Sequence, residues 1–149
     1  MIREFKEKDI SKINEIILDY LSYNPEYEIC KNKILESLEN ILNNNNRLFY
    51  VFTNSEDEAI AYMNLHIIDF PLISGKELYI SELFVDSKVR GQNIGSKFIE
   101  FAIDKAEKLE CKRIMLNNSI TSKAYERNFY KKLGFIHRDS MANFILKIT

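Results

Sequence analysis

The feature that most constrains the fold is a strand, turn, helix and strand succession in the second half of the chain. The apolar run "ELYISELFV" (77–85) precedes the turn "VRGQNIGSKF", which holds two of the four glycines. Residues 95–109 then place apolar side chains at helical spacing, and "KRIMLN" (112–117) is typical of a buried strand. Two strands joined by one helix form a parallel pair with a right-handed crossover. The sequence therefore predicts a sheet that contains a parallel pair.

The rest of the chain predicts mostly antiparallel strands and amphipathic helices. Asp9 is a candidate N-cap for the first helix, and Gly134 stands at the C′ position of the last. We expect an α/β fold, an α+β mixed sheet of about seven strands flanked by about four helices, in a single domain over 1–149. The expected strands are 1–5, 47–53, 59–68, 77–85 and 112–117 with two short ones in 135–148, and the expected helices are 10–22, 27–42, 95–109 and 122–133.

Composition excludes several classes of protein. The 149 residues carry a formal net charge of −1, so bulk charge implies neither a nucleic-acid nor a membrane partner. No apolar run has the length of a membrane span or of a secretory signal, and we expect a cytoplasmic protein. Cys30 and Cys111 have no metal-ligand spacing, so we expect reduced thiols and no metal site.

The turn between the strand and the helix has the composition of an anion site. Gly91 and Gly95 relieve steric crowding, and Asn93 tolerates left-handed dihedral angles. A glycine-containing turn presents main-chain N–H groups at the positive end of the helix dipole, where phosphate binds. Lys88, Arg90 and Lys97 add positive charge. The alternative is a tight connection with solvated lysines, and neither the Walker nor the Rossmann phosphate motif is present.

The segments "ELFVDSKVRGQNIGSKFIEFAI", "KRIMLN" and "YERNFYKKLGF", within residues 78–135, together resemble the GCN5-related N-acetyltransferase (GNAT) superfamily. Arg90 and Gly95 match the family's [QR]-x-x-G-x-[GA] turn, with Asn93 in place of its first glycine. The resemblance implies acetyl-CoA as co-substrate and a bulged, splayed strand pair that admits its pantetheine arm. The coenzyme-binding residues that it implies are Leu83, Phe84, Val85, Arg90, Gly91, Gln92, Asn93, Ile94, Gly95, Ser96 and Asn117.

Two residues are candidates for the acid–base chemistry of acyl transfer. Glu82 interrupts an apolar strand, where an unpaired carboxylate is costly, and strict alternation places it on one face with Ile80 and Phe84. The alternative is an exposed or ion-paired strand glutamate. The resemblance implies that Tyr130, in "FYKKLGF", protonates the departing CoA thiolate. Its alternative role is that of a half-buried packing aromatic.

The resemblance places the acceptor between two loops, "SYNPEYE" and "IDFPLISG". Tyr23, Tyr27 and Phe70 are therefore candidates for an aromatic wall that binds the acceptor. Acidic residues in the same loops favour a cationic amine. We expect transfer of an acetyl group to a primary amine such as a polyamine, amino sugar or amino acid. The alternatives are a protein or peptide acetyltransferase and a non-catalytic acyl-CoA sensor, and a homodimer is left open.

Overall fold

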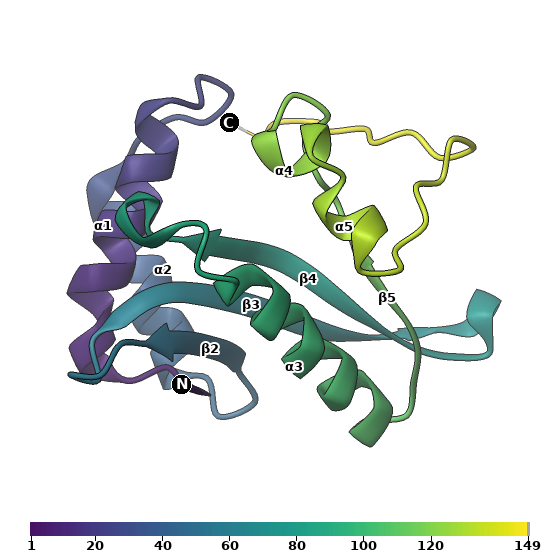
Figure 1. The fold of residues 1–149 in the computed structure, drawn as a ribbon, viewed down its shortest axis with the longest axis horizontal. Coiled ribbons are helices and arrows are strands. Elements are labelled where there is room, and N and C mark those ends of the chain that lie inside the picture. Colours follow the sequence, from purple (N-terminus) through teal and green to yellow (C-terminus); the bar gives the residue numbers. More distant parts are fainter. Residues whose placement is uncertain (149) are drawn as a thin grey trace. The chain divides into compact units, whose positions relative to one another are not determined.

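The computed structural model describes residues 1–148, which divide into two compact units, Met1–Asn117 and a second that begins at Asn118. In the first unit, α1 and α2 precede the strands β2, β3 and β4, and α3 joins β4 to β5 (Figure 1). The elements of this unit are β1 (Ile2–Glu4), α1 (Ile10–Ser22), α2 (Lys31–Asn43), β2 (Leu48–Thr53), β3 (Ala59–Phe70), β4 (Gly75–Val85), α3 (Ile94–Lys108) and β5 (Cys111–Leu116), with short 3-10 turns at Glu7–Asp9, Pro71–Ile73 and Ser87–Val89.

The five strands form one sheet in the order β1-β2-β3-β4-β5. All neighbours are antiparallel except β4 and β5, which are parallel and joined through α3. The mixed α/β fold and the parallel pair predicted from the strand, helix and strand pattern are thus confirmed. The predicted count of about seven strands is too high for the described residues, because no strand forms in 135–148.

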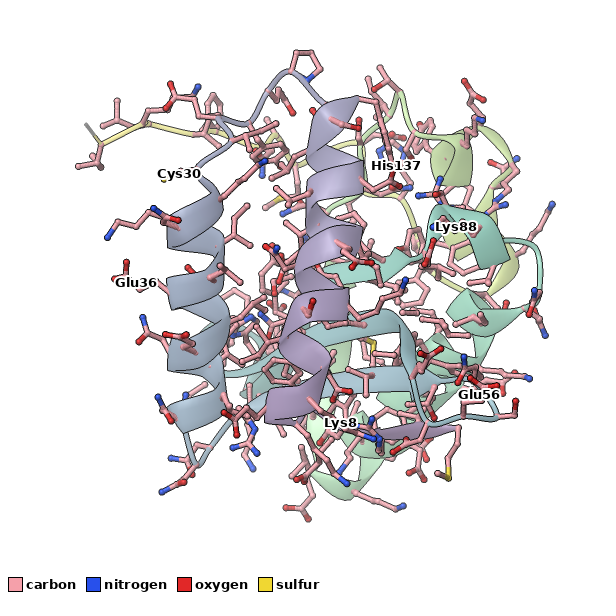
Figure 2. All side chains as sticks on the ribbon, turned by 90° about the vertical axis from the view of Figure 1, so that its left-hand side faces the viewer. Lys8, Cys30, Glu36, Glu56, Lys88 and His137 are labelled. Carbon is pink, nitrogen blue, oxygen red and sulfur yellow. The ribbon has the colours of Figure 1, made fainter. Side chains whose placement is uncertain are left out.

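Helices cover both faces of the sheet. On one face, α1 and α2 lie side by side and bury Ile13 and Leu38 against Phe49 and Tyr62, whose rings stack 5.2 Å apart (Figure 2). On the opposite face, Phe98 of α3 packs edge-on against Phe52 of β2. Because neighbouring residues of a strand point to opposite faces, β2 contributes side chains both to the core under α1 and α2 and to the core under α3.

The first helix begins at the predicted residue, but its N-cap works differently from the expectation. Asp9 occupies the N-cap position, yet its carboxylate makes no capping bond to α1. It accepts instead from the main-chain N–H of Lys6 at 2.9 Å and from the Arg3 guanidinium at 2.8 and 2.9 Å. The buried carboxylate therefore fixes β1 and the 3-10 turn before α1 rather than the helix itself.

The second unit contains two short helices where the sequence predicted one over 122–133. They are α4 (Lys123–Glu126) and α5 (Phe129–Lys132), separated at Asn128, which has φ 56°. Asparagine adopts this left-handed conformation more readily than other side chains, so the helical pattern on both sides did not continue through it. Gly134, with φ 92°, ends α5 at the predicted C′ position.

Residues 135–148 form neither helix nor strand, which corrects the expectation of two closing strands. Their composition is rich in strand-forming residues, but a strand also needs a partner edge, which composition does not supply. Large apolar side chains in this segment are exposed: Ile136, Met141, Phe144, Ile145, Leu146 and Ile148.

Candidate active site

The turn between β4 and α3 is built from two left-handed residues. Gly91 has φ 84° and Asn93, the N-cap of α3, has φ 62°, as expected from its tolerance of this region. A β-carbon added to Gly91 would meet no atom within 4 Å, so the backbone angle alone favours glycine there. Buried Ile94 and Phe98 hold the start of α3 against the sheet. Gly95 lies inside the first turn of the helix.

The N-terminus of α3 presents unused hydrogen-bond donors. The first main-chain N–H of the helix to find a protein acceptor is that of Lys97, which donates to the Asn93 carbonyl at 3.2 Å. Within residues 1–148, the N–H groups from Asn93 to Ser96 have no protein acceptor. Together with the dipole of a fifteen-residue helix, these groups give the N-terminus of α3 a partial positive charge, which favours an anion.

The Arg90 side chain donates two hydrogen bonds to groups outside the N-terminus of α3. Its Nε donates to the Val85 carbonyl at 3.2 Å and its Nη2 donates to the Tyr23 hydroxyl at 3.0 Å. The turn is also connected to α1 by Lys12, whose ammonium lies 3.5 Å from the Asp86 carboxylate. Two parts of α1 are therefore connected to the segment that precedes α3.

A bulge in β4 places Glu82 on the face covered by α1 and α2. Leu65 pairs with Ile80 and Asn64 pairs with Glu82, which leaves Ser81 as the extra residue. Asn64 and Leu65 are consecutive and point to opposite faces, so Ile80 and Glu82 do too. The expectation that they share a face is wrong, because strict alternation does not hold across a bulge.

The Glu82 carboxylate lies in a polar, partly buried position. It accepts from the Tyr62 hydroxyl at 3.4 Å and from Asn64 Nδ2 at 3.2 Å. Burial, followed by the charge of Glu82, raises the pKa of Tyr62 well above its usual value. No lysine, arginine or histidine pairs with Glu82 in the described part of the chain, so the ion-paired alternative has no support.

Beyond the bulge, β4 loses its parallel neighbour. The last pair between the two strands is Ile80 with Leu116, whereas β4 continues to Val85. Among residues 1–148, no strand pairs with residues 82–85 on the β5 side, which matches the predicted separation of the pair. Asn117 follows at the end of β5, where its Nδ2 donates to the Tyr79 hydroxyl at 3.4 Å.

Two of the three residues predicted for the aromatic wall, Tyr23 and Tyr27, lie in one aromatic cluster with Tyr20 and Phe84. Tyr23 and Tyr27 both contact Tyr20, with ring centroids 5.6 and 6.4 Å apart, and Tyr20 packs on Phe84 at 4.4 Å. The Phe84 ring centroid lies 5.6 Å from that of Tyr62. The Tyr62 hydroxyl in turn donates to the Glu82 carboxylate. A continuous aromatic path thus leads from the α1–α2 loop to the carboxylate.

Phe70, the third predicted member, does not belong to this wall. It pairs with Gly75 at the first residue of β4, and its ring lies 5.1 Å from the Arg113 guanidinium. Phe70 is eight residues along β3 from Tyr62, a distance of about 26 Å at strand rise. Sequence reasoning missed Tyr20 and Tyr62. Tyr20 lies within the amphipathic pattern of α1 and Tyr62 within the apolar run of β3, so neither stood out from residues that serve only in packing.

Tyr130 belongs to the second unit, where it lies between two aromatic rings. Its centroid is 4.9 Å from that of Phe129 and 5.7 Å from that of Phe135. Its carbonyl accepts the main-chain N–H of Phe135 at 3.1 Å, which closes α5 in a Schellman motif with Gly134. Burial raises the pKa of the Tyr130 phenol to about 12, so it is fully protonated at neutral pH.

Two features are absent from the described residues. No group of three or more histidine, cysteine, aspartate or glutamate side chains in 1–148 could hold a metal ion. Over the same residues, none of the helices has the length and apolar character required to cross a membrane. Cys30 and Cys111 form no disulfide in the described residues.

Comparison with known proteins gives related sequences for part of the chain. It is 38% identical over 68 residues to N-alpha-acetyltransferase 30 of Saccharomyces cerevisiae, covering 46% of this chain and 38% of that protein. It is 33% identical over 64 residues to glucosamine 6-phosphate N-acetyltransferase of Arabidopsis thaliana, covering 43% and 40%. Each match thus spans about two fifths of the curated relative's length.

The fold and the family extend over most of the chain. The crystal structure of a predicted acetyltransferase with acetyl-CoA from Clostridium acetobutylicum has the same fold, with a TM-score of 0.73 and 23% identity over 97% of this chain and 95% of that one. The model of the acetyltransferase (GNAT) family matches residues 12–135. The strand separation at β4, the unused amides of α3 and this match lead to one conclusion: the chain belongs to the acetyltransferase (GNAT) family.

Proposed function

We propose that this protein transfers an acetyl group from acetyl-CoA to a primary amine, by direct attack within a ternary complex. The observation that carries the proposal is the row of unpaired N–H groups from Asn93 to Ser96 at the start of α3. The β4–α3 turn connects these groups to the end of β4, where β4 no longer pairs with β5. The two curated relatives act, by their names, on an α-amino group and on glucosamine 6-phosphate. Both acceptors are primary amines.

The coenzyme diphosphate binds to the main chain of the β4–α3 turn. Residues Arg90 to Ser96 surround the helix N-terminus, and Lys88 and Lys97 add positive charge to it. The thioester then lies along residues 82–85, where the main chain of Leu83 to Val85 is free of β5. A main-chain N–H there donates to the oxyanion of the tetrahedral intermediate. Asn117, beside the same gap, contacts the pantetheine arm.

Glu82 accepts a proton from the attacking amine, directly or through water. An alkylammonium with a pKa near 10.4 is neutral in only about one molecule in 10³ at pH 7, a cost of about 4–5 kcal/mol. The amine nitrogen bonds to the thioester carbon, the carbon–sulfur bond breaks, and the amine proton passes to the carboxylate. Each oxygen of the Glu82 carboxylate accepts one hydrogen bond from a neutral donor, so lone pairs remain free to accept this proton.

Tyr130 donates to the departing CoA sulfur. Burial raises the pKa of its phenol to about 12, so the phenol stays protonated at neutral pH and for several units above it. The role comes from the place of Tyr130 in "FYKKLGF", the segment by which the sequence resembles the family.

The acceptor enters along the aromatic path formed by Tyr20, Tyr23, Tyr27 and Phe84. Tyr23 and Tyr27 are 54% and 55% exposed, so their rings are accessible to a ligand, whereas Tyr62 at the inner end is buried. An amine that carries an apolar or aromatic group beside its nitrogen suits this path, because the faces of aromatic rings attract both cations and apolar groups.

The test is a direct assay of transfer. The protein is mixed with acetyl-CoA and, separately, with a peptide bearing a free N-terminus, a lysine peptide with a blocked N-terminus, glucosamine 6-phosphate and spermidine. Free thiol release is followed, and acetylated product is identified by mass spectrometry. We expect at least one amine to raise release well above hydrolysis. If acetyl-CoA binds by calorimetry but no amine is acetylated, the protein is an acyl-CoA sensor and the proposal is wrong.

A further inference from the structure

One hydrogen bond connects the two loops that serve the two substrates. The Arg90 guanidinium donates to the Tyr23 hydroxyl at 3.0 Å, across 67 residues of sequence. Arg90 belongs to the turn before α3, and Tyr23 is the C-cap residue of α1, where the α1–α2 loop begins. We propose that Tyr23 is a positioning residue, which makes the conformation of the α1–α2 loop depend on coenzyme at the β4–α3 turn.

The Tyr23 side chain is suited to this role because its two ends have different partners. Its ring packs edge-on against Tyr20 at 5.6 Å, inside the aromatic wall, while its hydroxyl lies outside and meets Arg90. Tyr20 in turn accepts from Asn24 Nδ2 at 2.6 Å, and the Asn24 carbonyl accepts the N–H of Tyr27 at 3.5 Å. A displacement of Arg90 therefore reaches Tyr27, in the first half of the loop, through four successive contacts.

Arg90 makes a second hydrogen bond, which fixes its side chain to the end of β4. Arg90 Nε donates to the carbonyl of Val85, the last residue of β4, at 3.2 Å. Arginine is one of the few side chains that can bridge two acceptors in this way, because its guanidinium has five N–H donors in a fixed plane. An anion bound at the adjacent amides attracts the same guanidinium and competes with the Tyr23 hydroxyl for its N–H groups.

Binding of one substrate thus changes the loop that receives the other. This inference rests on the proposed function, since it needs a coenzyme at the turn. The expected coupling is the loss or gain of one exposed hydrogen bond, about threefold to tenfold in an equilibrium constant. By linkage, the acceptor alters the affinity for coenzyme by the same factor.

The native cysteine of the loop gives a readout that needs no acceptor. Cys30 is exposed at the N-cap of α2, at the far end of the loop, and Figure 2 shows it there, with Lys88 marking the turn. Cys111 is half-buried, and burial raises the pKa of its thiol, so Cys30 is labelled first. A polarity-sensitive dye on Cys30, its position verified by mass spectrometry, is titrated with acetyl-CoA while calorimetry measures coenzyme affinity on the same samples.

We expect acetyl-CoA to change the dye emission of the wild-type protein, with a midpoint equal to the calorimetric Kd. Tyr23→Phe removes only the hydroxyl and should lose most of the emission change, while its Kd stays within about threefold to tenfold of wild type. Tyr27→Phe is the matched control, because the Tyr27 hydroxyl in the same loop has no hydrogen-bond partner among residues 1–148 and its removal should leave the response intact.

The outcomes separate this inference from the proposed function. The positioning role is wrong if the wild-type protein binds coenzyme without any dye response. It is also wrong if the response of Tyr23→Phe equals that of Tyr27→Phe. Neither result contradicts the transfer activity. Absence of coenzyme binding overturns both. Circular dichroism of each variant verifies that the loss of response is not a loss of fold.

Discussion

Replacing Tyr130 by phenylalanine tests the acid side of the mechanism with the smallest change of shape. The substitution removes one hydroxyl and keeps the ring, which lies 4.9 Å from Phe129 and 5.7 Å from Phe135. We therefore expect the second unit to keep its fold. Any effect on turnover then comes from the missing O–H group.

The magnitude follows from the pKa of the phenol, which burial raises to about 12. A thiol has a reference pKa near 8.5, so complete proton transfer from this phenol to the thiolate is uphill by about 3.5 units, or about 5 kcal/mol. Tyr130 consequently stabilises the leaving thiolate by a hydrogen bond and does not fully transfer its proton before the C–S bond breaks. A hydrogen bond to a charged group contributes about 1.5–3 kcal/mol, so kcat should fall by about 10-fold to 150-fold.

Thiol release at saturating acetyl-CoA measures this loss, with Tyr125→Phe as control for removal of a neighbouring phenol. The wild-type rate should also show no decline caused by Tyr130 between pH 7 and 10, because its pKa lies near 12. A Tyr130→Phe variant that keeps more than half of kcat would refute the role. So would a basic limb near pH 10 that disappears in the variant, since that would place the phenol's titration two units too low.

Three further predictions concern the carboxylate, the turn and the N-terminal ion pairs. Glu82→Gln should lower kcat/KM by at least about 100-fold while leaving Tm nearly unchanged, because the amide oxygen can still accept from Asn64 Nδ2 and the amide NH2 can donate to the Tyr62 hydroxyl oxygen; a variant with near wild-type rate would contradict the assignment. Asn93→Val should cost about 1–2 kcal/mol in urea unfolding, because φ is 62° there, and Asn93→Gly should not; equal losses would contradict the strain argument. Lys8 and Arg3 lower the pKa of Asp57 to about 2, so its stabilising effect is present above pH 4 and is lost as pH falls toward 2. Asp57→Asn should therefore flatten the fall of Tm with acid, and an unchanged slope would contradict the linkage.

Local patterns predicted the elements that depend on local chemistry. The stripe from Phe98 to Ala106 predicted α3 to within one residue at each end, because an amphipathic face needs no information beyond its own spacing. The left-handed angle of Asn93 followed from the short list of residues that tolerate it. The parallel pairing of β4 and β5 followed from the helix between them.

Features that depend on pairing could not be obtained in this way. The bulge at Ser81 reverses the face of every residue after it, and nothing in "YISELF" distinguishes a bulged strand from a regular one. Residues 135–148 have strand composition without a strand partner. Phe70 was grouped with Tyr23 and Tyr27 by loop membership, whereas the register of β3 and β4 separates it from them.

Coenzyme recognition at the β4–α3 turn is tested most directly by a crystal structure of the protein with acetyl-CoA. We predict that diphosphate oxygens lie within about 3.2 Å of main-chain nitrogens between Arg90 and Ser96, with the thioester beside residues 82–85. A complex in which the diphosphate lies elsewhere, while those nitrogens remain without a phosphate partner, would contradict the account.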